Sequence, residues 1–226
     1  MLYLYENTYP FPGVIDEYVD VMGTDLLPGL IRYMTVLGVF RVSFRHRETF
    51  FLSELPKGTD SLEGLSNFVI HERDGLAWHR EGFRYRDEWL DSLLEGLPFS
   101  PTAAIIKERQ KRGDFMGNSL YYRLIYNVLP GKLDEFLKAF ETELLPLEEK
   151  RGMMLAGCYR WFGACGESGE ITTLWSVKNW AHWGRLRKAQ LKDPKFQRWM
   201  EKVSKWCAEW SYKFLIPAPY SQTLLH

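Results

Sequence analysis

Three side chains have the chemistry and the surroundings that proton transfer requires: His46, His71 and Glu54. An imidazole titrates near neutral pH, so a histidine suits general acid/base work. His46 ends an alternating apolar run, and His71 could reach the mouth of a pocket from a helix. Glu54 shares a strand face with Phe50 and Leu52, where loss of water favours the protonated carboxyl that an acid catalyst needs. We therefore predict His71, His46 and Glu54 as catalytic residues.

Two arginines, Arg41 and Arg160, occupy mid-strand positions between apolar neighbours. A pair of guanidinium groups can hold a carboxylate, an enolate or a phenolate. The alternative interpretation is a structural salt bridge to Glu6 or Glu54. Aromatic side chains would form the walls and favour a hydrophobic or aromatic substrate. The predicted substrate-binding residues are Arg41, Arg160, Tyr5, Tyr121, Trp161 and Trp175.

The sequence offers little for a metal ion. The three cysteines form no CxxC pair, which indicates reduced thiols rather than a zinc site. His71 and His79 are eight residues apart, but Asp74-Gly75 interrupts the predicted helix between them. Either histidine could be an axial haem ligand, although no haem-attachment motif is present. We predict no metal and no cofactor, with haem as the alternative.

The elements that would position these residues are clearest between residues 120 and 183. The strand-like run LYYRLIYNV is broken by Pro130-Gly131. An amphipathic helix follows, because one apolar stripe recurs at helical spacing: Leu133, Phe136, Leu137, Phe140 and Leu144. The runs GCYRWF and EITTLWSV predict two strands, and Asn179 offers the cap of another helix. Asp193-Pro194 predicts a helix restart, and residues 210–216 predict a fourth strand.

The same pattern occurs earlier in the chain, displaced by 118 residues. Pro12-Gly13 aligns with Pro130-Gly131, and the apolar stripe aligns with Ile15, Tyr18, Val19, Met22 and Leu26. After one inserted residue the displacement is 119, which pairs Gly38 with Gly157 and Arg41 with Arg160. A register that persists over about sixty positions indicates an internal duplication.

Each copy is predicted to have the ferredoxin-like order βαββαβ, a four-stranded sheet with both helices on one face. In the first copy we expect strands at 2–9, 38–46, 49–55 and 102–108, and helices at 13–33 and 59–94. The fold class is therefore α+β, with an N-terminal repeat (1–109), a linker (110–118) and a C-terminal repeat (119–226). Two such sheets packed face to face would form a dimeric α+β barrel with an interior.

The composition disfavours several classes of function. Lys plus Arg and Asp plus Glu both number 29, so no overall field favours nucleic acid or an anionic membrane. No stretch approaches about 20 consecutive apolar residues, and the N-terminus lacks the order of a signal peptide. We expect a soluble, cytoplasmic protein whose partner is a small hydrophobic or aromatic ligand, not nucleic acid or a membrane. A homodimer stays open.

Five segments of the second copy carry a family resemblance: residues 121–126, Pro130-Gly131-Lys132, Gly157, Thr173-Leu174-Trp175 and residues 185–193. They resemble the NIPSNAP-type branch of the dimeric α+β barrel superfamily. The arginine expected in the first strand is displaced, with Leu124 at its place and Arg123 beside it, so its role is not transferred. The resemblance covers nearly the whole second copy and implies the fold more strongly than the reaction.

The superfamily includes cofactor-free monooxygenases, polyketide cyclases, lactone isomerases and, among tandem-repeat members, haem enzymes. The fold alone does not choose among these activities. Our first hypothesis is a cofactor-independent acid/base enzyme, a lyase, isomerase, cyclase or monooxygenase acting on a small hydrophobic or aromatic metabolite. The alternatives are a haem-binding tandem-barrel enzyme and a non-catalytic ligand-binding or scaffold protein.

Overall fold

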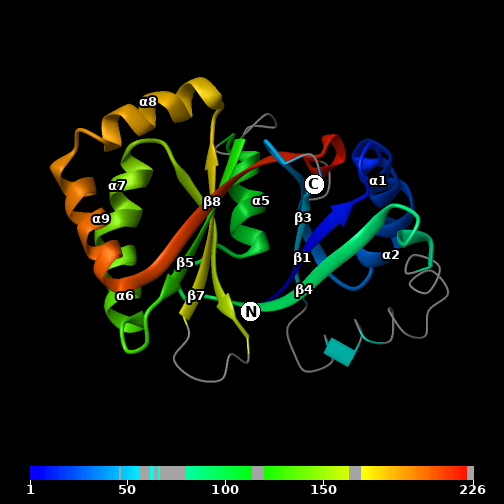
Figure 1. Cartoon of the computed structure of the whole chain (residues 1–226), viewed down its shortest axis with the longest axis horizontal. Coiled ribbons are helices and arrows are strands. Elements are labelled where there is room, and N and C mark those ends of the chain that lie inside the picture. Colours follow the sequence, from blue (N-terminus) through cyan, green and yellow to red (C-terminus); the bar gives the residue numbers. More distant parts are fainter. Residues whose placement is uncertain are drawn as a thin grey trace. The chain divides into compact units, whose positions relative to one another are not determined.

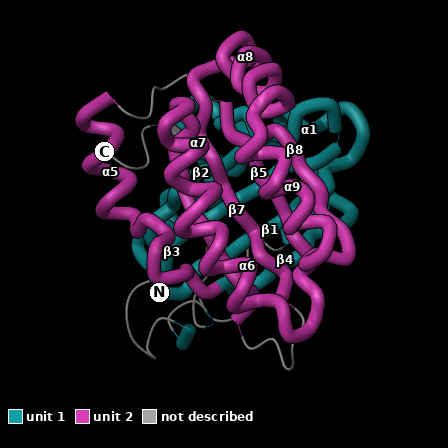
Figure 2. Tube along the Cα trace, turned by 90° about the vertical axis from the view of Figure 1, so that its left-hand side faces the viewer, with its two compact units in different colours: residues 1–94, 215–226 teal, residues 95–214 magenta. Residues whose placement is uncertain are grey.

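The chain is seen in a computed structural model that describes residues 1–45, 47–55, 62–63, 66, 80–113, 120–162 and 169–222. Its contacts define two compact units, coloured separately in Figure 2. Unit 1 comprises residues 1–94 and 215–226, and unit 2 comprises residues 95–214. Two long strands, β4 (Arg86–Gly96) and β8 (Cys207–Pro217), each supply residues to both units. The repeat boundaries at 109 and 119 stay a prediction from the duplication.

Unit 1 is a sheet covered on one face by a helix. Its strands are β1 (Leu2–Pro10), β2 (Thr35–Val42), β3 (Thr49–Glu54) and β4, hydrogen-bonded in the order β4-β1-β3-β2. The last residues of β8 pair with β2. The helix consists of α1 (Ile15–Val21), the π-helical turn η1 (Met22–Leu26) and α2 (Leu27–Leu30), and Tyr18 and Val19 are fully buried on it. A short helix, η3 (Pro219–Gln222), follows β8.

Unit 2 repeats this design with more helix. Its strands are β5 (Leu120–Val128), β6 (Met154–Trp161), β7 (Gly169–Val177) and β8, in the order β8-β5-β7-β6. Five helical elements connect these strands: α6 (Leu133–Ala139), the π-helical turn η2 (Phe140–Leu144), α7 (Leu145–Lys150), α8 (Trp180–Gln190) and α9 (Pro194–Trp206). In Figure 1 these helices lie along one face of the unit 2 sheet. Both units thus have the ferredoxin-like strand order, as predicted.

The duplication is visible in unusual local features that recur at the predicted displacement. Each first helix contains a π-helical turn, starting at Met22 and at Phe140, and each turn is followed by a proline, Pro28 or Pro146. Proline lacks an N–H group and its ring clashes with the preceding turn, so the wider π-helical turn lets the helix continue past the proline. The Pro-Gly turns also match, because Gly13 and Gly131 both have a positive φ.

A second shared feature lies in the strands β2 and β6. Each strand has a bulge, between Val36 and Gly38 or between Leu155 and Gly157. An aromatic ring two residues later, Phe40 or Tyr159, covers the glycine so closely that a Cβ atom would lie 2.0–2.5 Å from it. The glycine is therefore required by packing in both repeats.

Three predicted elements of the first repeat are wrong. Residues 102–108 are not a strand, because α5 (Ala103–Lys111) contains mostly strong helix formers and begins within the predicted repeat, running into the predicted linker. The fourth strand is β4 instead, over residues that we assigned to the helix at 59–94. The second strand ends at Val42 rather than at 46, because Phe44 has φ 63° and the chain turns there.

The predicted helix starts of unit 2 are confirmed. The side-chain oxygen of Asn179 accepts a hydrogen bond from the backbone N–H of His182 at 2.9 Å, which caps α8. Asp193 accepts from the N–H of Lys195 at 2.7 Å, and Pro194 occupies the first position of α9. These two caps fix where α8 and α9 begin, the two helices that cover the cleft described below. In the part of the chain that the structure describes, no helix is long and apolar enough to span a membrane.

Candidate active site

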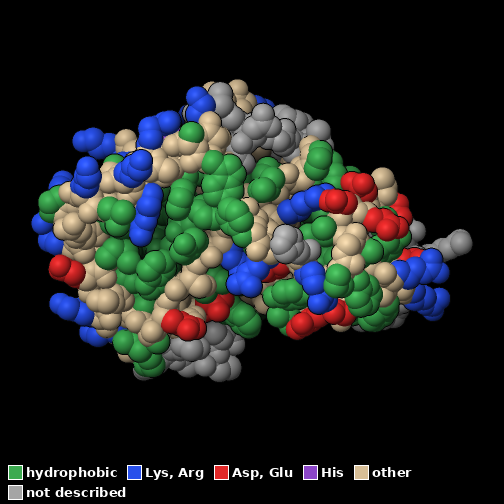
Figure 3. All heavy atoms as spheres, turned by 45° about the horizontal axis from the view of Figure 1, so that its top comes forward, with side chains coloured by type: hydrophobic (Ala, Val, Ile, Leu, Met, Phe, Trp, Pro, Cys, Tyr) green, Lys and Arg blue, Asp and Glu red, His purple; other side chains and the backbone are tan. Residues whose placement is uncertain are grey.

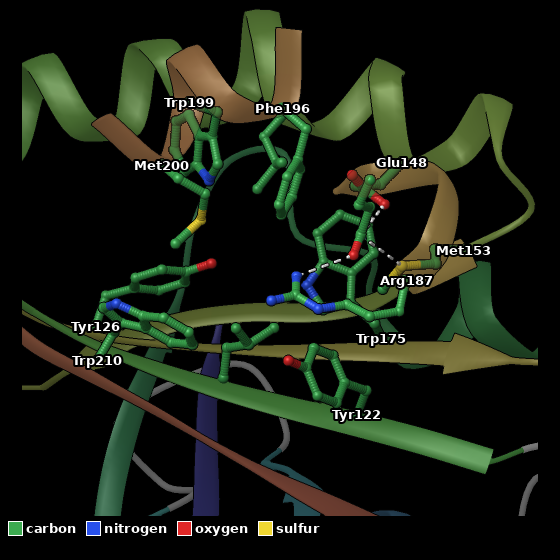
Figure 4. A pocket seen from close by; sticks show the side chains of 13 residues that line it. Tyr122, Tyr126, Glu148, Met153, Trp175, Arg187, Phe196, Trp199, Met200 and Trp210 are labelled. Atoms are coloured by element: carbon green, nitrogen blue, oxygen red, sulfur yellow. Dashed lines mark hydrogen bonds between the residues drawn. The ribbon is translucent and has the colours of Figure 1, made fainter. Parts of the chain in front are cut away.

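A cleft in unit 2 lies between the sheet and the helices α7, α8 and α9 (Figure 4). Its cavity volume is about 40 Å³, and all the space between atoms, counted out to the open mouth, is about 460 Å³. The lining is predominantly aromatic and aliphatic, with one cation and one carboxylate among the described residues. The lining residues are Tyr122, Leu124, Tyr126, Leu144, Glu148, Met153, Trp175, Arg187, Gln190, Phe196, Trp199, Met200 and Trp210.

Strand and helix periodicities place the apolar walls. Tyr122, Leu124 and Tyr126 alternate along β5, so all three point to the helix side of the sheet. Phe196 and Trp199 follow at helical spacing on α9, and both are buried. Pockets of this apolar and aromatic type, with few polar groups, are typical of small-molecule sites.

Arg187 is the cation of the cleft. It comes from α8, and Figure 4 shows its guanidinium directed into the space between Phe196 and Tyr122. Its Nη1 donates to Gln190 Oε1 at 3.3 Å, and its Cζ lies 5.8 Å from the centre of the Phe196 ring. A guanidinium in aromatic surroundings can hold a planar anion through two parallel hydrogen bonds.

Glu148 anchors the polar end of the cleft. Its side chain is 3% exposed, Gln190 Nε2 donates to its Oε2 at 2.8 Å, and Arg151 forms an ion pair with its Oε1. Burial raises the pKa of Glu148, while the bonds from Gln190 and Arg151 oppose that effect. Because both oxygens have protein partners, Glu148 positions Gln190, and through it Arg187, rather than facing a ligand directly.

Arg151 connects this group to the start of α9. It forms a second ion pair with Asp193, the residue that caps α9. The N–H of Lys195 and the Arg151 guanidinium hold the pKa of Asp193 below its usual range. The Cζ atom of Arg151 also lies 5.7 Å from the centre of the Phe196 ring. The network therefore joins α7, α8 and α9 above the cleft.

Two phenols of the cleft remain protonated at neutral pH. Burial raises the pKa of both Tyr122 and Tyr126 far above the ordinary value of a tyrosine. A buried phenol of this kind donates a hydrogen bond but does not act as a base near pH 7. The cleft can therefore bind an aromatic ring, accept negative charge at Arg187 and offer a phenol O–H to an oxygen atom.

Of the residues predicted from the sequence, Trp175 lines this cleft. It lies on β7, is 1% exposed and donates from Nε1 to Thr173 Oγ1 at 3.1 Å. Trp161, by contrast, ends β6 with 46% of its surface exposed and donates to Glu170. His46 and His71 lie outside the described residues, so their assignment as catalytic residues stays a prediction.

The predicted arginines form exposed ion pairs. Arg41 pairs with Asp16, and Arg160 with Glu95 at 2.7 Å, and more than a third of each Arg160 and Glu95 side chain is exposed. The salt-bridge interpretation named Glu6 or Glu54 as partners, which is wrong. An arginine on the outer half of a strand reaches acids on neighbouring elements more readily than those on its own sheet face.

Glu54 lies with Tyr3 and Tyr5 on the face of the unit 1 sheet opposite its helix. Tyr3 donates to Glu54 Oε2 at 2.9 Å, and the Tyr5 ring packs against Phe50 at 4.9 Å. In unit 2 the matching position of Tyr3 is Tyr121, which bonds to Ser176. The predicted face sharing of Glu54 with Phe50 agrees with this placement, and its catalytic role stays a prediction.

The first repeat carries polar residues where the second has its aromatic cleft. The displacement of 118 pairs three cleft-side residues with polar ones: Leu124 with Glu6, Tyr126 with Thr8, and Phe136 with Tyr18. Thr8 donates to Glu6 Oε1 at 2.6 Å, and Arg86 donates to the same oxygen at 3.3 Å. The two repeats have therefore diverged at the same structural position.

The polar cluster of unit 1 also includes Asp91. Asp91 as a whole residue is exposed, but desolvation of its carboxyl group and the neighbouring Glu6 carboxylate raise its pKa to about 7, while Arg86 acts in the opposite direction. Arg86 itself is 1% exposed, and its Cζ lies 4.2 Å from the centre of the Trp89 ring. The cluster is a titratable feature of unit 1 that the sequence did not indicate beyond Glu6.

Sequence reasoning missed Arg187, Glu148, Gln190 and Tyr122 as site residues. Arg187 and Gln190 are three residues apart on α8, and they share the helix side that Trp183 also uses. That spacing was a usable signal. Glu148 gave none, since a glutamate beside Glu149 and Lys150 is typical of a solvated helix face.

The cleft residues do not match the haem alternative. Among the described residues that line it, none is a histidine or a cysteine, the ligands that hold haem iron in most haem enzymes. Nor do the described residues contain a cluster of three or more metal-binding side chains. His71 and His79, on which the haem hypothesis rests, lie outside the described residues.

Residues 122–222 match the family model described as NIPSNAP. This segment supplies all thirteen residues of the cleft. The resemblance to the NIPSNAP-type branch is thus confirmed for the second repeat. No protein of curated function matches the sequence.

Three solved structures match almost the whole chain. A provisionally assigned monooxygenase from Lactobacillus acidophilus NCFM is 8% identical, with 96% of this chain and 93% of that chain covered and a TM-score of 0.62. One from Fusobacterium nucleatum is 10% identical, covers 96% and 91%, and has a TM-score of 0.63. An anthrone oxidase-like protein is 13% identical, with 96% and 91% covered and a TM-score of 0.62. At these identities the likeness shows the fold, which confirms the α+β class with two tandem ferredoxin-like repeats of the dimeric α+β barrel type.

Proposed function

We propose that the chain is an enzyme of the monooxygenase type that acts on a small hydrophobic or aromatic metabolite in the unit 2 cleft. The observation that carries this proposal is the aromatic lining around a single guanidinium, Arg187, held by the hydrogen-bonded Gln190 and Glu148. The names of the three matching structures support a monooxygenase over a lyase, an isomerase or a cyclase.

In this proposal Arg187 binds the oxygen of a phenol or enol and stabilises its anion. A guanidinium placed in an apolar cleft favours the charged form of its ligand far more than water does. Tyr122, whose phenol stays protonated, donates a hydrogen bond to the same substrate or to dioxygen. Gln190 and Glu148 are positioning residues, because they touch Arg187 or each other rather than the substrate.

The substrate anion supplies the electrons, so the reaction needs no cofactor. Loss of a proton from a CH₂ group gives the enolate, and the carbon that lost the proton reacts with dioxygen. One oxygen atom becomes the new carbonyl oxygen, and the second leaves as water with the remaining hydrogen and the abstracted proton. The carbon is oxidised by four electrons and dioxygen is reduced by four, which balances the step. Among the described residues that line the cleft, Glu148 has protein partners on both oxygens and the two phenols stay protonated, so we assign no proton acceptor for the first ionisation. His71, His46 and Glu54 belong to unit 1, and their catalytic role stays a separate prediction.

Dioxygen uptake with a panel of anthrones and naphthols tests the proposal. We expect Arg187→Ala to lower kcat by about 10²- to 10³-fold, the usual effect of removing one oxyanion donor. Arg185→Ala, an exposed arginine two residues earlier on α8, is the matched control and should retain activity. Equal activity in the Arg187 and Arg185 variants would show that the cleft guanidinium has no role in turnover.

Two further results would select the alternatives. A Soret band after haem addition, lost on replacement of His71 or His79, would favour the haem enzyme. Tight binding of the panel compounds to the cleft without dioxygen uptake or any product would favour a non-catalytic ligand-binding protein. Alanine at His71, His46 and Glu54 in turn tests the catalytic role predicted for each of them, which requires that turnover is lost while the fold is intact.

A further inference from the structure

A group of aromatic side chains, here called the aromatic patch, follows β8 and the first turn of α8 in unit 2; Trp180, Trp210 and Tyr212 are exposed, Trp183 is half-buried and Phe214 is buried beneath them. Its members are Trp180, Trp183, Trp210, Tyr212 and Phe214. Phe214 is the centre, with ring centroids 4.7 Å from Trp180, 4.8 Å from Trp183 and 5.8 Å from Tyr212. Figure 3 shows hydrophobic side chains gathered over this face of unit 2.

Three members of the aromatic patch are exposed to solvent. Trp180 is 41% exposed, Trp210 39% and Tyr212 50%. Single exposed apolar residues are normal on a protein surface, but contiguous large ones mark sites that bind a partner. Packing within unit 2 therefore leaves this surface uncovered.

Positive charge borders the patch. Residues 178–192, which include α8, contain five Lys or Arg and no Asp or Glu, although the whole chain is neutral. Four of these cations are exposed: Lys178, Arg185, Lys188 and Lys192. Arg185, Lys188 and Lys192 are spaced three and four residues apart, so they share one face of the helix. In Figure 3, Lys and Arg side chains run along the margin of the hydrophobic surface.

The aromatic patch is continuous with the mouth of the cleft. Trp210 belongs to both, and Tyr122 of the cleft contacts Tyr212 at 5.4 Å and Phe214 at 5.1 Å between ring centroids. A compound that reached the aromatic patch would therefore be in contact with the entrance of the cleft.

We propose that the aromatic patch and its cationic border bind the surface of an anionic phospholipid bilayer. Trp and Tyr side chains favour the interface between headgroups and acyl chains, and Lys and Arg favour anionic headgroups. Unit 2 lies on such a surface without crossing it, with the cleft mouth at the level from which a hydrophobic compound leaves the lipid. We expected no membrane partner because the whole chain has no net charge, and that argument does not apply to a local surface.

Charge distinguishes the lipid surface from a second copy of the chain. A symmetric dimer through the aromatic patch would bring the same surface of both copies together. The cations of residues 178–192 would then face one another with no acidic residue in the segment to compensate, which disfavours association. An anionic bilayer compensates the same charges and takes up the aromatic rings.

Vesicle flotation tests the proposal on the full chain. Wild type should float with vesicles that contain 30% phosphatidylglycerol and remain unbound with pure phosphatidylcholine. Each cation near an anionic surface contributes about fivefold in affinity, so R185Q/K188Q should bind about 25-fold more weakly. K111Q/K138Q neutralises two exposed lysines of α5 and α6 and should bind like wild type.

A second variant tests the aromatic part. W180S/Y212S introduces no charge and removes two rings. It should lower the affinity for vesicles by about tenfold or more, because each ring would otherwise transfer apolar area from water into the bilayer. The matched control is F162S: Phe162 directly follows β6, a strand separated from β8 by β5 and β7, and is 47% exposed. Circular dichroism of each variant confirms that the fold is retained.

Three results would overturn the proposal. One is the absence of binding to anionic vesicles at 20 mM salt, and another is binding that R185Q/K188Q leaves unchanged. The third is a dimer in sedimentation equilibrium that W180S/Y212S dissociates, which would assign the aromatic patch to contact between copies of the chain. All three are independent of whether the cleft turns over a substrate.

Discussion

Replacing Gln190 by leucine removes the hydrogen bond that fixes the polar end of the cleft. Gln190 Nε2 donates to Glu148 Oε2 at 2.8 Å, and the Glu148 side chain is only 3% exposed, so water cannot take the place of the donor. A hydrogen bond to a charged group contributes about 1.5–3 kcal/mol. The weaker bond from Arg187, at 3.3 Å, is replaceable by water because Arg187 is half-buried. We expect Gln190→Leu to lower the free energy of unfolding by about 2 kcal/mol.

Guanidinium chloride unfolding followed by tryptophan fluorescence measures this loss. The matched control is Gln197→Leu on α9, whose side chain is exposed and donates to the backbone oxygen of Leu191 at 3.0 Å. That exposed change should cost no more than about 0.5 kcal/mol. If Gln190→Leu matches wild type, or if both variants lose the same amount, the buried Glu148 is not held as we describe.

Four further predictions concern packing and titration. Gly157→Ala should destabilise the chain by about 1–3 kcal/mol in thermal unfolding, because a Cβ atom would collide with the Tyr159 ring at 2.0 Å. Gly184→Ala, in open space on α8, should instead stabilise by up to about 1 kcal/mol. The pKa of Asp91 is raised to about 7, so its contribution to the free energy of unfolding is present below pH 4 and lost as the pH rises through 7. Asp91→Asn should remove that loss. If stability falls with pH equally in wild type and Asp91→Asn, the assignment is refuted. Burial raises the pKa of the Cys207 thiol to about 11, so iodoacetamide should not label it at pH 8 in the folded chain, and its contribution to stability should disappear between pH 9 and 11.

The elements of the second repeat could be predicted because each has one dominant period. The stripe from Leu133 to Leu144 fits only a helix, and the caps at Asn179 and Asp193 are local signals that the structure confirms. The prediction for the β4 segment was wrong because Trp89, Leu90 and Leu93 fit a helix face as well as a strand. Only pairing with its neighbours in the sheet decides such a segment.

The candidate site could be predicted only in part. We predicted an aromatic pocket in the interior between two facing sheets. Trp175 does line a pocket, but this cleft lies between the sheet and the helices of a single repeat. Arg187 and Glu148 look like solvated helix charges in the sequence, and 42 residues separate Glu148 from Gln190. Burial of one carboxylate against one amide is a tertiary event without a local signature.

The divergence between repeats explains why one of them carries the cleft. The first repeat has Glu6 and Thr8 where the second has Leu124 and Tyr126, so hydrogen-bonded polar groups lie on the helix side of its sheet at the positions that form cleft walls in the second repeat. An apolar ligand would have to displace those bonds, which costs more than entering an aromatic lining. We therefore expect ligand binding in unit 2.

The most direct measurement is a crystal structure of the chain with a brominated 1-naphthol, located by the anomalous signal of bromine. We predict the ring within the cleft against Trp175 and Phe196, with the naphthol oxygen within hydrogen-bonding distance of the Arg187 guanidinium. A fully occupied bromine site elsewhere with the cleft empty, or a ligand in the cleft whose oxygen points away from Arg187, would contradict the account.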